Sequence, residues 1–235
     1  TNDASSTGIG TIDSTGSVNT DAGFSIVSYS GNSTAGATIA HGLGATPKMM
    51  IVRKRNSAEN WLVYHASTGN TGATLLNGTN AFFQDDMWNS TSPTSSVFTV
   101  HGGAGANASG GTYIAYCFTD VKGYSKFSSY IGNGNADGAF VYTGFKSAFV
   151  MIKKTSGTGN WCLFDNKRGV NGAMIQLNPD VNNADNTSNY IDFLSNGFKC
   201  RNTASDKNAS GGSYIYMAFS ENPFVTSTGV PATAR

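Results

Sequence analysis

The chain has 235 residues, a formal net charge of +1 and only 12% charged residues. This balance lacks the basic footprint of a protein that binds nucleic acid or an anionic membrane. No apolar run approaches the ~20 residues that a transmembrane helix needs, so we expect no membrane insertion. Aromatic side chains make up 11% of the chain and supply the buried area that disordered chains lack.

The first 22 residues offer little for a core to bury. Between Thr1 and Asp21 the apolar side chains are Ala4, Ile9, Ile12 and Val18. Three glycines in the same stretch interrupt any helix. We therefore expect residues 1–22 to form a linker or extended neck that joins the domain to something N-terminal.

Residues 23–122 and 123–224 are two copies of one unit. An apolar run with a basic end at 50–55, followed by Asn-Trp and a second apolar run at 60–65, reappears at 150–155 and 160–165. The segment 107–114, Asn-Ala-Ser-Gly-Gly-Thr-Tyr-Ile, recurs almost unchanged at 208–215. A fixed spacing of about 100 residues indicates an internal tandem duplication.

The apolar runs in both copies are short and rich in β-branched and aromatic residues, and no apolar stripe has the helical period. Residues 49–54 are apolar on both faces, as in a covered central strand. The sequence predicts an all-β fold, an antiparallel β-sandwich of jelly-roll or lectin-like type. Each copy forms its own sandwich or supplies half of a larger one packed with the other copy. Residues 225–235 are small and polar and are expected to form a tail.

Catalytic patterns are absent from the sequence. Asp85 and Asp86 are the only adjacent acidic pair, and neighbours on a strand point to opposite faces. The three histidines have no metal-ligand spacing, and no nucleophile elbow occurs. The cysteines at 117, 162 and 200 fit neither a disulfide framework nor a zinc site, so we expect buried thiols. The sequence therefore favours a protein that is not an enzyme.

The polar loop around Trp88 is the strongest candidate for a binding site. An exposed indole can stack on a sugar ring, while the polar groups of Asp85, Asp86 and Asn89 bond its hydroxyls. Tyr190 is the expected counterpart in the second copy. The alternative is that both rings pack beneath their loops.

The loop from Asp180 to Asn186 offers oxygen ligands at Asp180, Asn182 and Asp185. Such oxygens suit a structural calcium ion, but the loop lacks the central glycine and the final glutamate of an EF-hand. A plain polar loop is the alternative interpretation. No other cofactor is expected.

Several motifs together resemble a known family. They are Gly42-Leu43-Gly44-x-x-Pro47, Met50–Lys54, Asn60–His65, Ser109–Ala115, Glu221–Phe224 and Pro231–Arg235. Together they resemble an uncharacterised C-terminal domain of tail-fibre and other virion proteins of marine and cyanobacterial bacteriophages, and the resemblance covers about residues 23–235. The second copy departs from it, because Gly144–Ala148 lacks the proline turn.

The resemblance implies a β-sandwich on the virion surface, often in trimeric fibres, with receptor binding as the usual role. We therefore expect a structural domain of a tail fibre, spike or capsid fibre that binds a host-surface glycan or receptor, and that contacts other virion proteins through its N-terminal segment. The alternatives are an adaptor or decoration domain without a host ligand and, disfavoured by the few carboxylates, a polysaccharide depolymerase. Function is expected where the copies differ, at residues 78–96 and 178–194.

Overall fold

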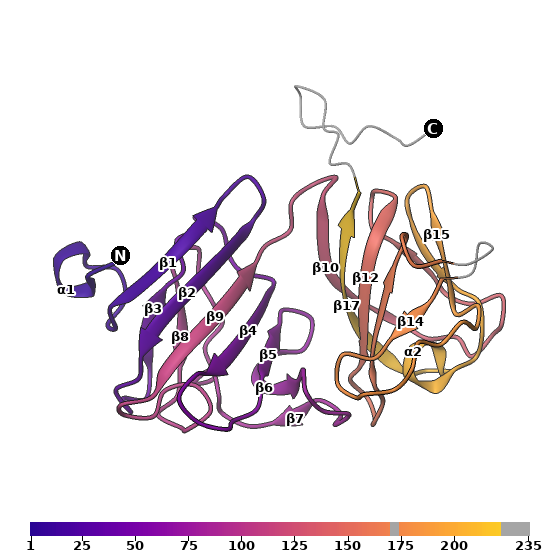
Figure 1. Cartoon of the computed structure of the whole chain (residues 1–235). Helices are drawn as coiled ribbons and strands as arrows, with labels where there is room; N and C mark the ends of the chain where they lie inside the picture. The colour runs from indigo at the N-terminus through magenta and orange to yellow at the C-terminus, as the bar shows by residue number, and fades with distance from the viewer. Residues whose placement is uncertain (170–173, 222–235) are drawn as a thin grey trace. The chain divides into compact units, whose positions relative to one another are not determined.

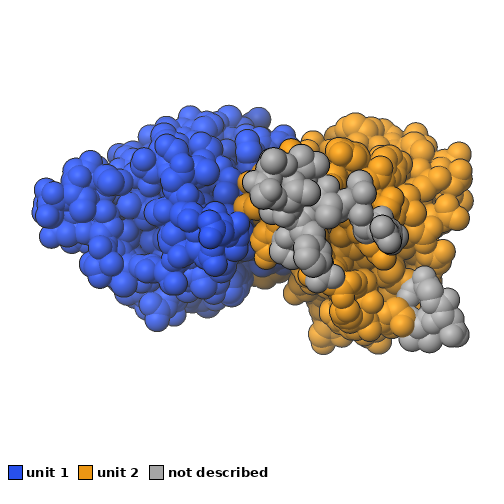
Figure 2. Space-filling view, turned by 90° about the horizontal axis from the view of Figure 1, so that it is seen from above, with its two compact units in different colours: residues 1–76, 82–119 blue, residues 77–81, 120–235 orange. Residues whose placement is uncertain are grey.

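A computed structural model describes residues 1–169 and 174–221 (Figure 1). It is nearly all β, with 42% strand and 4% helix, which confirms the predicted fold class. The chain divides into two compact units (Figure 2). Unit 1 comprises residues 1–76 and 82–119, and unit 2 comprises residues 77–81 and the chain from residue 120 onward. Each unit has its own hydrophobic core, so each copy of the repeat forms its own sandwich.

Unit 1 is built from one large antiparallel sheet and one small one. Its elements are α1 (Ala4–Thr7), β1 (Ser14–Asn19), β2 (Phe24–Ser30), β3 (Ala37–Ala40), β4 (Met49–Lys54), β5 (Leu62–His65), β6 (Gly69–Leu75), β7 (Phe83–Gln84), β8 (Val97–Val100) and β9 (Thr112–Phe118). The large sheet has the order β1-β2-β9-β4-β5-β6-β7, and β3 pairs with β8 in the small sheet.

The core of unit 1 lies between these two sheets. Alternate residues of β2 and β9, such as Val27 and Tyr113, point into it, as the two-residue period of a strand requires. Ile39 and Phe98 of the small sheet, both fully buried, close the other side. This arrangement gives unit 1 the two layers of a sandwich.

The N-terminal segment is part of unit 1, so the predicted linker or neck over residues 1–22 is wrong. β1 pairs with β2 over its whole length, from Ser14 opposite Tyr29 to Asn19 opposite Phe24. Ile12, 6% exposed, belongs to the core. An edge strand is held by backbone hydrogen bonds, which require no apolar side chains, and five of the six residues of β1 are exposed.

Unit 2 repeats the central part of this arrangement. Its elements are β10 (Ser125–Ile131), β11 (Phe140–Tyr142), β12 (Ser147–Lys154), β13 (Trp161–Asp165), β14 (Gln176–Leu177), β15 (Ile191–Leu194), β16 (Gly197–Cys200), α2 (Ser205–Asn208) and β17 (Ser213–Ser220). The order β10-β17-β12-β13-β14 corresponds to β2-β9-β4-β5-β6 of unit 1, and β11-β16-β15 form the second layer. The predicted tail over residues 225–235 lies outside the described residues.

The strand that follows β13 differs between the units. In unit 1 the corresponding strand β6 has seven residues, whereas β14 has two. Unit 2 also includes residues 77–81 of the first copy, and Gly159 donates its backbone N–H to the carbonyl of Thr79 at 2.9 Å. Among the described residues, no helix is long and apolar enough to cross a membrane.

Candidate binding site in unit 2

The repeated closing motif has a structural role in both units. The Asn107 side chain accepts the N–H of Asn32 at 2.9 Å and donates to the carbonyl of Thr34 at 2.9 Å. Asn208 makes the same two bonds in unit 2, to residues 133 and 135, at 3.0 and 2.8 Å. Both asparagines are fully buried and satisfy backbone groups that would otherwise lack partners.

The tyrosine of the motif is fixed in the same way. Tyr113 donates its hydroxyl to the carbonyl of Ala104 and stacks on Tyr29 with ring centroids 5.1 Å apart. Tyr214 donates to the carbonyl of Ser205 and stacks on Tyr130 at 5.0 Å. Burial raises the pKa of both stacked hydroxyls in each unit, so they remain neutral donors.

These shared bonds identify equivalent positions in the two units. Tyr29 donates its hydroxyl to the carbonyl of Ala106, and Tyr130 donates to the carbonyl of Lys207, both at 2.7 Å. Lys207 therefore occupies the place of Ala106, a core residue of unit 1. The preceding residue is Gly105 in unit 1 and Asp206 in unit 2.

Two further apolar positions of unit 1 become polar or aromatic in unit 2. Leu62 pairs with Val52 in unit 1, and Cys162 pairs with Ile152 in unit 2. The carbonyl of Met87 accepts the N–H of His101 at 3.0 Å, and the corresponding bond in unit 2 joins Tyr190 and Arg201 at 2.7 Å. The same backbone framework therefore carries an apolar cluster in unit 1 and a polar one in unit 2.

The ammonium group of Lys207 is the centre of this polar cluster. Its side chain is 1% exposed. Nζ lies 2.6 Å from Oδ1 of Asp206, 2.7 Å from Oε1 of Gln176 and 3.8 Å from Sγ of Cys162. It also lies 3.9 Å from the ring centroid of Tyr190. A buried cation is tolerated only with such partners, so the cluster depends on all its members.

The thiol of Cys162 belongs to the same cluster. It is fully buried and donates to Oδ2 of Asp206 at 3.3 Å. Burial raises the pKa of this thiol well above its ordinary value, against the attraction of Lys207. Cys162 is therefore a neutral donor and not a reactive thiolate.

A hollow of about 480 Å³ opens beside the cluster. Its lining consists of Thr79, Thr158, Gly159, Asn160, Tyr190, Ala204, Ser205, Asp206 and Lys207. It thus combines one aromatic ring with a carboxylate, an amide and several hydroxyls, which are the groups that bind sugars. The ring of Tyr190 is held in place, since its hydroxyl accepts a hydrogen bond from Asn186 at 2.7 Å.

A second buried lysine lies close to this region. Lys153 is fully buried, and its Nζ donates to the carbonyls of Gly78 and Gly159 at 3.1 and 2.6 Å. Burial lowers its pKa to about 8, although the charge of Asp180 acts in the opposite direction. Nζ lies 5.8 Å from the ring of Trp161, much as Arg53 lies 5.7 Å from Trp61 in unit 1. Because the same cation–aromatic pair occurs in both units, it is part of the shared fold and does not mark a site of unit 2.

Trp88 is buried, so the predicted exposure of its ring is wrong. The side chain is 0% exposed, Nε1 donates to the carbonyl of Gly72 at 2.9 Å, and the ring packs edge-on against Tyr64. The indole fills the core of unit 1 and cannot stack on a sugar. Asp85 and Asp86 are exposed on the loop, and Asn89 adopts a left-handed turn conformation with φ 50°. Of the predicted aromatic residues, Tyr190 alone borders the unit 2 hollow.

Two of the three proposed calcium ligands, Asp180 and Asp185, have other partners. Oδ2 of Asp180 accepts the N–H of Trp161 at 3.2 Å, and Asp185 lies 4.0 Å from Arg168. Asn182 is exposed. Within the described part of the chain, no group of three or more His, Cys, Asp and Glu residues is placed to hold a metal ion.

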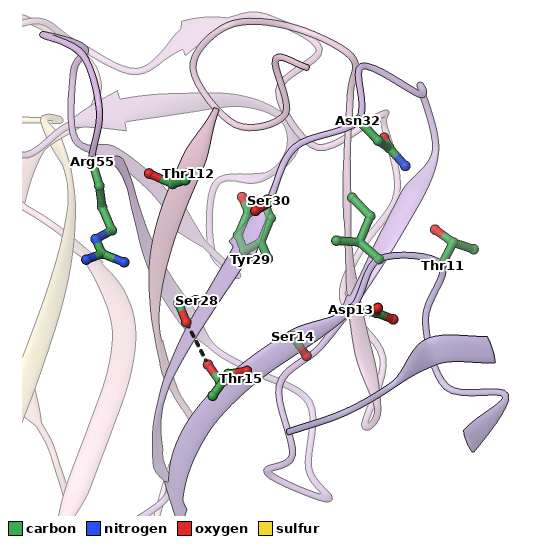
Figure 3. A pocket seen from close by; sticks show the side chains of 11 residues that line it. Thr11, Asp13, Ser14, Thr15, Ser28, Tyr29, Ser30, Asn32, Arg55 and Thr112 are labelled. Atoms are coloured by element: carbon green, nitrogen blue, oxygen red, sulfur yellow. Dashed lines mark hydrogen bonds between the residues drawn. The ribbon is translucent and has the colours of Figure 1, made fainter. Parts of the chain in front are cut away.

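Unit 1 has a larger hollow, of about 560 Å³, between β1, β2 and the loop of Arg55 (Figure 3). Hydroxyl groups dominate its lining, and one of them, on Ser28, donates to the carbonyl of Thr15 at 3.0 Å. Its aromatic residue, Tyr29, is buried and stacked on Tyr113. Because this hollow has no accessible ring face, it is the weaker candidate for a sugar.

Fold and site together define an all-β protein with a duplicated sandwich and a polar hollow in its second unit. A family model for a domain of unknown function, DUF7483, matches residues 1–223, and the chain belongs to this family. The match includes the N-terminal strand as well as both copies of the repeat. Neither the curated proteins nor the solved structures contain a match.

Proposed function

We propose that the protein is a non-catalytic binding domain of a bacteriophage virion, in a tail fibre, spike or capsid fibre, and that the unit 2 hollow binds a host-surface glycan. The virion context rests on the motif resemblance. The binding role rests on one observation: Tyr190 and Asp206 border a hollow at positions where unit 1 has Met87 and Gly105. As the resemblance implies, the proposal includes a trimeric fibre attached to other virion proteins.

The chemistry of the hollow suits a sugar. A pyranose presents a face of C–H groups, which pack on an aromatic ring, and hydroxyls at its edge. Tyr190 provides the ring. At the edge of the sugar, the carboxylate of Asp206 can accept hydrogen bonds from hydroxyls, and the amide of Asn160 can accept or donate them. Since Asn186 and Lys207 already hold the tyrosine, little side-chain entropy is lost when the ligand binds.

The same lining argues for binding without cleavage. Asp206 is the one carboxylate among the described residues that line the hollow. Its two oxygens already accept hydrogen bonds from Lys207 and Cys162. Glycosidases usually place two carboxylates across the scissile bond, one of them free to deliver a proton. This favours a receptor-binding domain over a depolymerase.

A glycan array tests the proposal, with host capsular and lipopolysaccharide sugars included. Tyr190→Leu keeps an apolar cover over Lys207 but loses the ring, so affinity should fall about tenfold. Thr158→Trp should fill the hollow and abolish binding, because Thr158 is exposed on its rim. Thr203→Trp is the matched control, since residue 203 is exposed but does not line the hollow.

Each failure has its own meaning. If the wild-type protein binds no glycan, the adaptor or decoration domain without a host ligand becomes the better account. If it binds and Thr158→Trp binds equally well, the hollow is not the site. Release of reducing ends from host polysaccharide would contradict the non-catalytic role. Light scattering of the purified protein measures the chain stoichiometry, and a monomer would contradict the trimeric fibre.

A further inference from the structure

An amine, a primary amide and a carboxylate meet in the core of unit 2. Lys207 and Gln176 are 1% and 4% exposed, and Nζ of Lys207 lies 2.7 Å from Oε1 of Gln176. Oδ1 of Asp206 lies 2.6 Å from the same nitrogen. We propose that Lys207 and Gln176 condense to an intramolecular amide bond, with Asp206 as the group that carries the protons.

Both reacting groups are held by their surroundings. The backbone N–H and carbonyl of Gln176 are bonded to Asn186 at 2.9 and 3.1 Å, and its Nε2 donates to Asn178. The backbone of Lys207 is bonded to Ala204 and, through its carbonyl, to the hydroxyl of Tyr130. Intramolecular groups reach effective concentrations on the order of 10⁵ M or more once their reacting atoms are aligned, and fixed backbones favour such alignment. Gln176, which water would attack in competition, is 4% exposed and does not line the hollow, so water has little access to its amide carbon.

The reaction conserves atoms and electrons and requires no co-reactant. The Lys207 ammonium gives a proton to Oδ1 of Asp206, and the neutral amine then attacks Cδ of Gln176. As the Cδ–Nζ bond forms, Nζ gives up a second proton and the Cδ–Nε2 bond breaks. Asp206 passes both protons to Nε2, which leaves as ammonium, and the carboxylate is restored. Cys162 orients this carboxylate through its hydrogen bond to Oδ2.

The bond would attach the shortest strand of the unit 2 sheet. β14, which carries Gln176, pairs with β13 through only two residues, Leu163 with Leu177 and Phe164 with Gln176. In unit 1 the longer β6 takes this place, and the indole of Trp88 bonds to its Gly72. A covalent link between residues 31 apart would tie α2 to the short strand. This inference does not depend on the proposed glycan.

The intact mass of the full chain tests the inference. After a day at pH 8, the wild-type protein should be lighter than its sequence by about 17 Da, the mass of one ammonia. Asn-Gly pairs such as Asn77-Gly78 also lose ammonia when they form succinimides, so the mass is measured again after hydroxylamine, which opens succinimides but not amides. The loss should persist. Trypsin should then yield residues 169–199 joined to residues 202–235, since it cannot cleave after a modified Lys207.

Variants show which residues are responsible for the loss of mass. Gln176→Ala and Lys207→Met should each have the full sequence mass, whereas Lys153→Met, which changes the other buried lysine of unit 2, should keep the loss. A wild-type chain with its full mass, and with residues 169–199 and 202–207 recovered as separate tryptic peptides, would overturn the proposal. That measurement needs no variant, so it decides the question even if the substitutions impair folding.

Discussion

Replacement of Lys153 by Met should remove a pH dependence from the stability of unit 2. Burial lowers the pKa of this lysine from its usual 10.5 to about 8 in the folded protein. Between these two values the unfolded chain binds one more proton than the folded chain. The free energy of unfolding therefore rises with pH in this window. Below pH 8 both states are protonated, and the cost of burying the charge is constant.

The magnitude follows from the same linkage. Each pH unit within the window adds at most about 1.4 kcal/mol to the free energy of unfolding. Buried thiols act in the opposite direction: burial raises the pKa of Cys162 and Cys200 above the usual 9.0, so their contribution to stability falls once the unfolded chain ionises. The titration of Lys153 therefore dominates the pH dependence between pH 8 and 9. Over this interval we expect the free energy of unfolding of the wild-type unit 2 to rise by about 1 kcal/mol.

Urea unfolding at a series of pH values from 7 to 10, followed by tryptophan fluorescence, measures this effect. The unit 2 transition is the one that Asn208→Ala shifts, since Asn208 lies in that unit. The difference in unfolding free energy between wild type and Lys153→Met, followed against pH, gives the contribution of the lysine alone, because both proteins contain the same thiols. Lys154→Met, a change at the half-exposed neighbour, is the control and should leave the slope unchanged. Parallel curves for wild type and Lys153→Met from pH 8 to 10 would refute the reasoning.

Three further predictions concern burial and the repeated motif. Trp88→Phe should destabilise unit 1 by about 2 kcal/mol through a lost hydrogen bond and unfilled space, and an unchanged urea midpoint would contradict the buried indole. Asn107→Ala leaves two backbone groups unpaired and Asn208→Ala leaves three, so each should cost its own unit about 2–3 kcal/mol in calorimetry; a shift in the opposite unit would be inconsistent with this role. The three cysteines should resist a thiol reagent for hours in the native protein and react within minutes in urea; rapid native labelling would show that one is accessible.

Most of the fold could be predicted from the sequence because the copies share the residues that fix it. Asn107 and Tyr113 recur with their partners, and the strands beside them alternate with a period of two. β1 could not be found in this way. With five of its six residues exposed, it has no apolar alternation, and its pairing with β2 is a property of the backbone.

The site was harder to predict than the fold. A polar loop gives no indication of where its Trp will lie, and the carbonyl of Gly72 satisfies the indole of Trp88 inside the core. Gln176 and Lys207 are 31 residues apart, and no spacing rule brings them together. One signal was available: Lys207 directly precedes the repeated motif, at the position where the first copy has Ala106.

That substitution shows how a duplicated fold can accommodate a new polar cluster in its core. The backbone around residue 207 is held by the same tyrosine hydrogen bond as in unit 1, so a new side chain there leaves the framework intact. A lone lysine in that core would cost several kcal/mol, because a buried charge needs partners. The buried ammonium of Lys207 therefore needs the side chains of Asp206, Gln176 and Tyr190, and the four residues form one cluster. Tyr190 lies in residues 178–194, where the copies were expected to differ, whereas Asp206 and Lys207 lie outside that segment. Function in such a protein is better sought at equivalent core positions whose chemistry has changed than in the divergent loops alone.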